Sequence, residues 1–373
     1  MTSDEYRLAV ERDWRHNMAV FVAWEFIWAF GMPFAMISTF APAYLGAVES
    51  PKWLIGFVLS CPALFGAGQI FLSHYVVPQR RLSVFRISMT ACAIPLLAYA
   101  AAATIWGGKW PPLLHWTLYS ATQIIFSGVS SLVLSLYWEM MTDNVPPLRR
   151  GLLFGLRMAA AGVPGLAMGY LATQFLARFD TPLNFRLGFL IGNGFFLASC
   201  VVLWFVRDNV NPAHSAASQE SGGKAFLHFA WDSLRTLWHE KNFRTAVIFI
   251  VLLAVAVNSA PFMVAAAHEK LGATAGQQGV FGVIYLGTMA GLGWMIGLIA
   301  DRRGYRLVAC LCSALMAVSL LLCLAVPKIG FWYLAYGAYS LSGMSVGMIL
   351  CNLGAEQCPG VPPNRLMAVG NII

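Results

Sequence analysis

The chain has 373 residues, of which 59% are hydrophobic and only 11% charged, and its mean hydropathy is +0.68. This composition excludes a soluble globular protein and predicts a membrane protein. The formal net charge is +8. A basic excess of this size needs no nucleic-acid partner, because a membrane protein places its basic residues beside anionic lipid.

Apolar runs long enough to cross a bilayer recur along the whole chain. A membrane-spanning α-helix needs about 20 residues, since it rises about 1.5 Å per residue through a hydrocarbon core of about 30 Å. We therefore predict an all-α membrane protein with ten complete spans and the start of an eleventh near Arg365. The ten spans are 17–44, 52–75, 84–106, 113–138, 151–177, 184–206, 245–267, 278–300, 306–326 and 330–354.

A polar stretch, 207–224, separates the sixth span from the seventh. After it, apolar residues such as Phe226, Leu234 and Trp238 recur at helical spacing. This pattern predicts a flexible linker followed by an amphipathic helix on the membrane surface. The expected organisation is a six-helix bundle (1–206), a cytoplasmic linker with its helix (207–243) and a second, incomplete bundle (244–373).

The basic residues predict the orientation of the chain. When the segments between spans are assigned alternately to two sides, 18 of the 24 Lys and Arg fall on the side of the amino terminus and the linker. Basic residues concentrate in cytoplasmic loops. We expect a multi-pass protein of the cell inner membrane with a cytoplasmic amino terminus.

Two short polar turns carry recognisable motifs. Residues 297–306 read GLIADRRGYR and form a charged turn between two spans. Residues 143–151 read DNVPPLRRG and residues 359–367 read PGVPPNRLM, so similar turns recur about one half of the chain apart. Such a repeat indicates two related halves.

Together these features resemble the major facilitator superfamily of secondary transporters, and residues 31–66 resemble the first hairpin of poorly characterised bacterial members. The resemblance implies two pseudo-symmetric helix bundles that move a solute by alternating access. It also implies twelve spans, so we expect this chain to be truncated at its carboxyl end. The first-half copy of the turn, SHYVVPQRR at 73–81, departs from the pattern because it lacks the acidic residue and the glycines.

The resemblance also implies a gate at the turn, formed by Gly297, Asp301, Arg302, Arg303 and Gly304. In the family the acidic residue lies near the start of a helix in the opposite half. A carboxylate there meets unpaired amides and the positive helix end, an interaction worth about 0.3 to 1 kcal/mol. The alternative for Asp301 and the two arginines is a solvated turn that only marks the topology.

Two charged residues lie inside spans. Glu25 is eight residues beyond Asn17, about 12 Å from the inner end, and Arg157 is six residues beyond Gly151, about 9 Å from the same face. A charged carboxylate at that depth is costly unless it is protonated, paired or in a watery cavity, and such residues usually serve function. We predict that Glu25 and Arg157 take part in proton coupling. A purely structural ion pair is the alternative, and Arg157 could instead contact an anionic substrate.

Other polar residues in the spans are weaker candidates for substrate binding: Gln69, Gln123, Asn258 and Tyr336, with Tyr339 beside the last. The resemblance implies that the first, fourth, seventh and tenth spans line a central cavity. Asn258 begins the sequence NSAP, which would interrupt a helix and free backbone groups for a ligand. An interhelical hydrogen bond is the alternative for each of them.

The sequence shows no catalytic constellation and no nucleotide-binding P-loop, and its seven histidines are scattered. We therefore predict no enzyme, no cofactor, no metal and no ATP-driven pump. The expected function is secondary active transport of a small organic solute, coupled to protons, by a monomer in the lipid bilayer. The alternatives are a transporter-like sensor that binds solute without net transport, and an uncoupled uniporter.

Overall fold

The computed structural model describes residues 2–35, 40–66, 68, 69, 72, 75–212, 231, 235, 239, 241–257, 260–273, 275–344, 349 and 352. Every regular element in these ranges is helical, which confirms the all-α prediction. The predicted surface helix near Phe226 and the second copy of the VPP turn lie outside the described residues.

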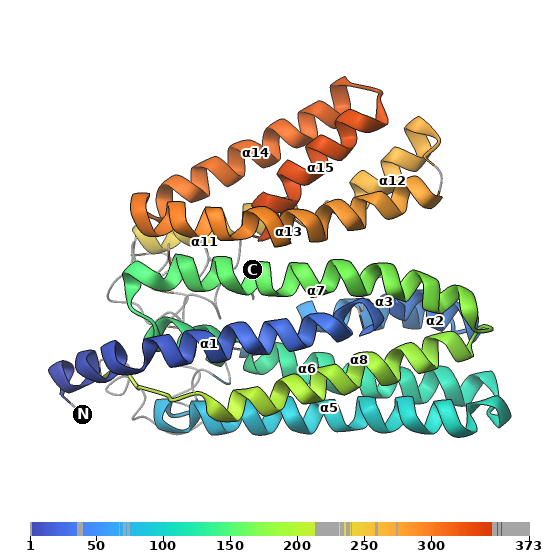
Figure 1. Cartoon of the computed structure of the whole chain (residues 1–373), viewed down its shortest axis with the longest axis horizontal. Coiled ribbons are helices and arrows are strands. Elements are labelled where there is room, and N and C mark those ends of the chain that lie inside the picture. The colour runs from blue at the N-terminus through green and yellow to red at the C-terminus, as the bar shows by residue number, and fades with distance from the viewer. Residues whose placement is uncertain are drawn as a thin grey trace.

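The first half of the chain forms one bundle of long helices (Figure 1). They are α1 (Ser3–Ala35), α2 (Phe40–Ala47), α3 (Lys52–Gly66), α5 (Arg81–Trp106), α6 (Pro112–Asn144), α7 (Arg150–Arg178) and α8 (Leu183–Val202). Single 3-10 turns precede or follow several of them: η1 (Pro78–Arg80), η2 (Gly107–Lys109), η3 (Pro147–Arg149) and η4 (Leu203–Phe205). Proline begins η1, α6 and η3, where its missing amide costs no hydrogen bond.

The second half forms the upper layer in Figure 1. Its described helices are α11 (Lys241–Val257), α12 (Ala260–Leu271), α13 (Ala275–Arg303), α14 (Tyr305–Ala325) and α15 (Ile329–Met344). The turn between α13 and α14 contains Gly304 at φ 85°, a backbone conformation that side chains disfavour, which explains the glycine in the GLIADRRGYR motif.

Seven helical stretches among the described residues are long and apolar enough to cross a membrane. They cover the predicted first, third, fourth, fifth, sixth, eighth and ninth spans. The other three predicted spans fall on shorter described helices, namely α3, α11 with α12, and α15. The structure therefore supports a multi-pass membrane protein, while the number of ten spans stays a prediction.

Helices α7 and α13 join the two halves (Figure 1). Small residues bring their backbones together: a Cβ atom on Gly155 would lie 2.6 Å from Trp294 Cα, and one on Gly293 would lie 2.8 Å from Met158 Cβ. Near the start of α7 and the end of α13, Gly151 and Gly297 touch through their backbones. Membrane helices that lack bulky side chains at their interface pack in this close way.

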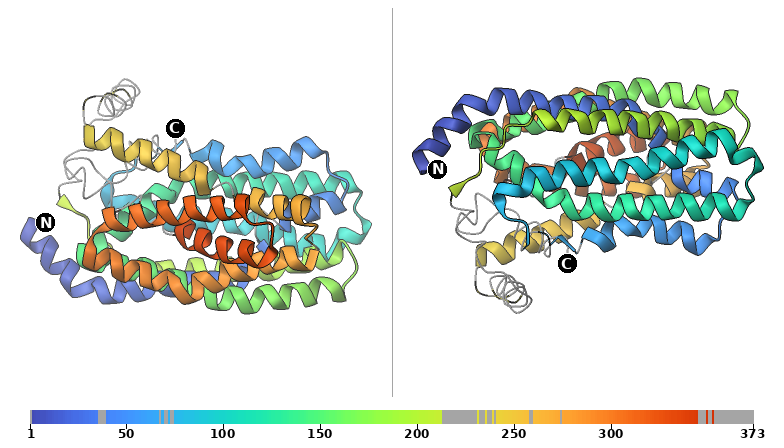
Figure 2. Two further views of the ribbon diagram at one scale, coloured as in Figure 1. Left: turned by 90° about the horizontal axis from the view of Figure 1, so that it is seen from above. Right: turned by 90° about the horizontal axis from the view of Figure 1, so that it is seen from below.

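The amino terminus, the start of α7 and the turn from α13 to α14 lie at one end of the molecule (Figure 1 and Figure 2). We call this the inner end, because the sequence predicts that it faces the cytoplasm. The close contact between Gly151 and Gly297 shows that the two halves meet there.

This packing predicts that α7 tolerates no side chain at residue 155. Gly155→Ala places a methyl group against the Trp294 backbone, which cannot rotate away, so we expect the overpacking cost of about 1 to 3 kcal/mol. The measurement is the midpoint of thermal unfolding in detergent, which should fall by several degrees. Gly291→Ala in α13 is the control, since nothing lies within 4 Å of its added Cβ atom. Equal midpoints for the two variants would show that the seam is looser than described.

Candidate functional site

A largely buried ion pair joins α1 to α7. The Nη2 atom of Arg157 donates to Oε1 of Glu25, across 132 positions of sequence. The two side chains are only 4% and 13% exposed, respectively. The structure thus brings together the two residues that the sequence singled out for proton coupling. Their role in proton coupling stays a prediction.

The guanidinium of Arg157 is held by its surroundings as well as by Glu25. Its Cζ atom lies 5.1 Å from the ring centroid of Tyr137, 5.6 Å from that of Trp138 and 5.5 Å from that of Phe154. Its Nη1 atom donates to Met141 Sδ at 3.2 Å. Aromatic faces attract a cation, so these contacts fix the position of the charge.

The ion pair lies beside the seam between the two halves. Ala29 is one helical turn beyond Glu25, and Ala161 is one turn beyond Arg157, so each alanine shares a face with its charged neighbour. Ala29, Ala161 and Met289 of α13 form one buried cluster, with Met158 and Tyr285 packed against it. The ion pair thus lies one helical turn from residues that pack against the second half.

Asp301 caps the start of α7. Its two carboxylate oxygens accept hydrogen bonds from the amides of Gly151 and Leu152, each at 2.7 Å. These amides belong to the first turn of α7, where no helical partner exists and the helix dipole is positive. The contact has the geometry expected of the family's acidic residue, and it links the end of α13 to the opposite half.

The other residues of the expected gate have simpler surroundings. Arg302 and Arg303 are exposed in the last turn of α13, which fits the solvated-turn alternative as well as a gating role. Gly297 allows the backbone contact with Gly151, and Gly304 allows the turn into α14. A gating function for this group stays a prediction.

The described members of the predicted substrate set have polar or aromatic partners outside the ion pair. Gln69 donates from Nε2 to the Ser131 carbonyl oxygen at 2.8 Å, and Gln123 donates to the Tyr119 hydroxyl at 3.1 Å. The Gln69 contact matches the alternative of an interhelical hydrogen bond, whereas the Gln123 contact lies within α6. Tyr336 stacks on Tyr339, whose hydroxyl donates to the carbonyl of residue 256 in α11. Asn258 lies outside the described residues, and a substrate-binding role for the four stays a prediction.

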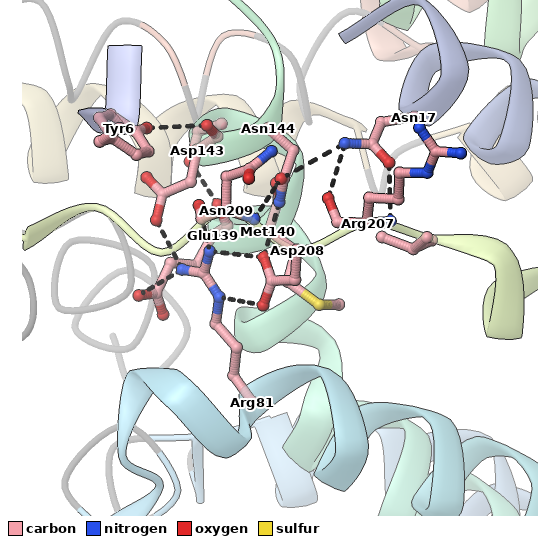
Figure 3. A network of polar contacts seen from close by, with 12 residues as sticks. Tyr6, Asn17, Arg81, Glu139, Met140, Asp143, Asn144, Arg207, Asp208 and Asn209 are labelled. Carbon is pink, nitrogen blue, oxygen red and sulfur yellow. Dashed lines mark hydrogen bonds and ion pairs between the residues drawn. The ribbon is translucent and has the colours of Figure 1, made fainter. Parts of the chain in front are cut away.

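The sequence reasoning missed a polar network at the inner end (Figure 3). Arg81, at the start of α5, is fully buried and binds three carboxylates. Its Nη1 atom lies 3.0 Å from Glu139 and 2.6 Å from Asp143, and Nη2 lies 2.8 Å from Asp208. The spacing of Glu139 and Asp143, four residues apart at the end of one span, was the signal available in the sequence.

The same network holds the first residues of the linker (Figure 3). Asn144 donates to Asp208 at 2.7 Å. Asn17 donates to the carbonyl oxygen of Arg207 at 2.8 Å and accepts from its amide at 2.9 Å. The start of the linker is therefore held in place against the inner ends of α1, α5 and α6.

Comparison with solved structures identifies the fold. A bound form of the proton:xylose symporter XylE aligns with a TM-score of 0.65 at 12% identity, covering 100% of this chain and 86% of that one. The fucose:proton symporter FucP of E. coli aligns with a TM-score of 0.66 at 14% identity, covering 96% and 89%. The human organic anion transporter MFSD10 aligns with a TM-score of 0.58 at 12% identity, covering 96% and 91%.

Sequence comparison gives the family itself. No curated protein matches the chain significantly. The family model described as Major Facilitator Superfamily matches residues 115–357, which is more than half of the chain. With the all-helical fold and the shared architecture of the solved transporters, this match shows that the chain belongs to the major facilitator superfamily.

Proposed function

We propose that this protein is a secondary active transporter that moves a small organic solute by alternating access and couples that movement to protons. The observation that carries the proposal is the buried ion pair between Glu25 and Arg157, placed beside the seam between the two halves. Membership of a transporter superfamily supports the general class. The coupling is the finer step, and it rests on the chemistry of the pair.

A carboxylate and a guanidinium in a membrane span stabilise each other only while both are charged. A proton on Glu25 would remove its charge and leave Arg157 without its counter-ion. The energy of the pair therefore depends on protonation, and Ala29 and Ala161, one helical turn from the pair, pack against Met289 of the other half. A protonation event there can favour one arrangement of the halves over the other.

The alternating movement would involve two pseudo-symmetric bundles with ten complete spans, an inner contact and a central cavity. The contact of Asp301 with the start of α7 serves as the inner latch in this proposal. It can form only while the inner ends of α7 and α13 are together. The described arrangement would then be a state closed at the inner end.

The structural neighbours support solute transport with protons. XylE and FucP are described as proton symporters of sugars, and MFSD10 as an organic anion transporter. At sequence identities of 12 to 14%, the similarity concerns the fold alone and does not identify the substrate. A monomer in the cell inner membrane with a cytoplasmic amino terminus completes the proposal, on the basis that 18 of the 24 basic residues fall on that side.

Glu25→Gln should abolish accumulation driven by a pH gradient while leaving downhill exchange. The substitution keeps the shape of the side chain and removes its titration. The assay uses proteoliposomes, pH gradients of both signs, and labelled xylose, fucose and benzoate as probes, with protein-free vesicles as blanks. Glu11→Gln, at an exposed position of the same helix, is the matched control and should behave as the wild type.

Other outcomes of this assay separate the alternatives. Normal pH-driven accumulation by Glu25→Gln would show that the residue is structural. Flux that ignores the gradient in the wild type would identify a uniporter. Binding of a probe without any flux would identify a sensor.

Asp301→Asn should open the inner end more often. An uncharged amide interacts less strongly with the two amides and the helix dipole, so the closed state loses about 0.3 to 1 kcal/mol, a roughly two- to fivefold shift in population. The measurement is the rate at which an impermeant maleimide labels a single cysteine introduced at Met158, after the eight native cysteines are replaced. Arg306→Gln, exposed at the start of α14 and outside the expected gate, is the control. Equal labelling rates in the two variants would leave the motif as a topological turn.

A further inference from the structure

The surroundings of Arg157 hold its guanidinium in place, so it stays where it is when the Glu25 carboxylate moves away. Three aromatic rings surround its Cζ atom, at 5.1, 5.6 and 5.5 Å, and Met141 accepts from Nη1. A guanidinium stays protonated in proteins. The positive charge is therefore permanent and fixed at this level of the bundle, whatever happens to Glu25.

Few other ionisable groups on the helices packed against α1 could compensate that charge. Tyr137 of α6 and Tyr285 of α13 are phenols near the pair. Glu139 and Asp143 of α6 are bound to Arg81 at the inner end. The remaining charged or imidazole side chains of α6, α7, α8 and α13 in the described residues lie toward the helix ends: His115, Arg150, Arg178, Arg186, Asp301, Arg302 and Arg303.

The net charge of the site determines which kind of solute can bind when Glu25 takes up a proton. Glu25 and Arg157 together are neutral. A proton taken from water by the Glu25 carboxylate leaves a net charge of one at a buried position, which is strongly unfavourable. One incoming anion restores neutrality. A neutral solute does not.

Resting on the proposed function, we propose that the substrate is a small organic anion, and that its carboxylate replaces that of Glu25 on Nη2 of Arg157. Glu25 takes one proton from water as it leaves the guanidinium. The site then holds Arg157 with the substrate anion, beside a neutral Glu25, and its total charge is unchanged. One proton accompanies each anion.

The residues around the pair favour an apolar body on this anion. Rings surround Arg157, and Met158, Met289 and Tyr285 line the neighbouring seam. A sugar would need many hydrogen-bond donors and acceptors. The two glutamines that the sequence offered for this task are engaged elsewhere, with Ser131 and with the Tyr119 hydroxyl. An aromatic or aliphatic monocarboxylate fits these surroundings.

Benzoate is the probe for this proposal, and benzamide is its uncharged counterpart. Binding to the purified full chain in detergent is followed by calorimetry at pH 6 to 8, in buffers of different ionisation enthalpy, which counts protons taken up. The wild type should bind benzoate and not benzamide, with about one proton per benzoate at the alkaline end. At that end of the range, the apparent affinity of the wild type for benzoate should fall about tenfold for each unit by which the pH rises.

Two variants and a control separate the roles of the pair. Glu25→Gln should bind benzoate at least tenfold more tightly than the wild type at pH 8, without proton uptake, because Arg157 has lost its internal counter-ion. Arg157→Gln should lose benzoate binding. Glu11→Gln should match the wild type. If Arg157→Gln does not fold, Glu25→Gln still tests the proposal, because the proposal requires this variant to bind benzoate more tightly than the wild type.

Three results would overturn the proposal. They are benzoate binding without proton uptake in the wild type, benzamide binding as well as benzoate, and no benzoate binding by folded Glu25→Gln. These results do not decide proton coupling itself. If a neutral probe such as xylose is accumulated by a pH gradient and Glu25→Gln abolishes this, the transport proposal stands while the anion proposal falls.

Discussion

The arrangement of the first bundle depends on how its buried charges are paired. A charge inside a membrane protein is tolerated when an opposite charge or a polar group meets it. Glu25 and Arg157 satisfy this condition for each other, and they tie α1 to α7. Arg81 satisfies it with carboxylates from α6 and from the segment after η4. Because each pairing needs side chains from two or more elements, the pairings constrain which helices are neighbours.

Helix α7 carries three of the contacts that matter for movement. Its first amides bind Asp301, its middle carries Arg157, and its glycines lie against α13. All three lie on one continuous helix, so in the proposed mechanism a shift at one of them would reach the others through α7. The proposal therefore needs no direct contact between Glu25 and Asp301.

The depth of a residue in the membrane can be calculated from its position in a predicted span, but the direction in which its side chain points around the helix cannot. Glu25 and Arg157 are at similar depths from the same end, and this was enough to suggest that they meet. Gln69 and Gln123 also lie inside spans, yet their side chains bond within the first bundle. Arg81 was missed for another reason: its partner Asp208 is 127 positions away and beyond the last span of the first half, where spacing carries no signal. The amides that Asp301 caps lie 150 and 149 positions away, so spacing alone carries no signal for this contact either, and it was the resemblance of the motif that pointed to it.

The two charge clusters differ in what they can do. The Arg81 network joins α5, α6 and the start of the linker, and Asn17 of α1 is bonded to the same linker segment. Its members belong to the first half or to the linker residues bonded to it, and none belongs to a described helix of the second half. Movement of one half against the other leaves such a network intact. The ion pair lies instead beside residues of α13, where relative movement changes the surroundings. In the proposed mechanism, a proton on Glu25 would therefore bias the arrangement of the halves, while the inner network would keep the first bundle and the linker together during the movement.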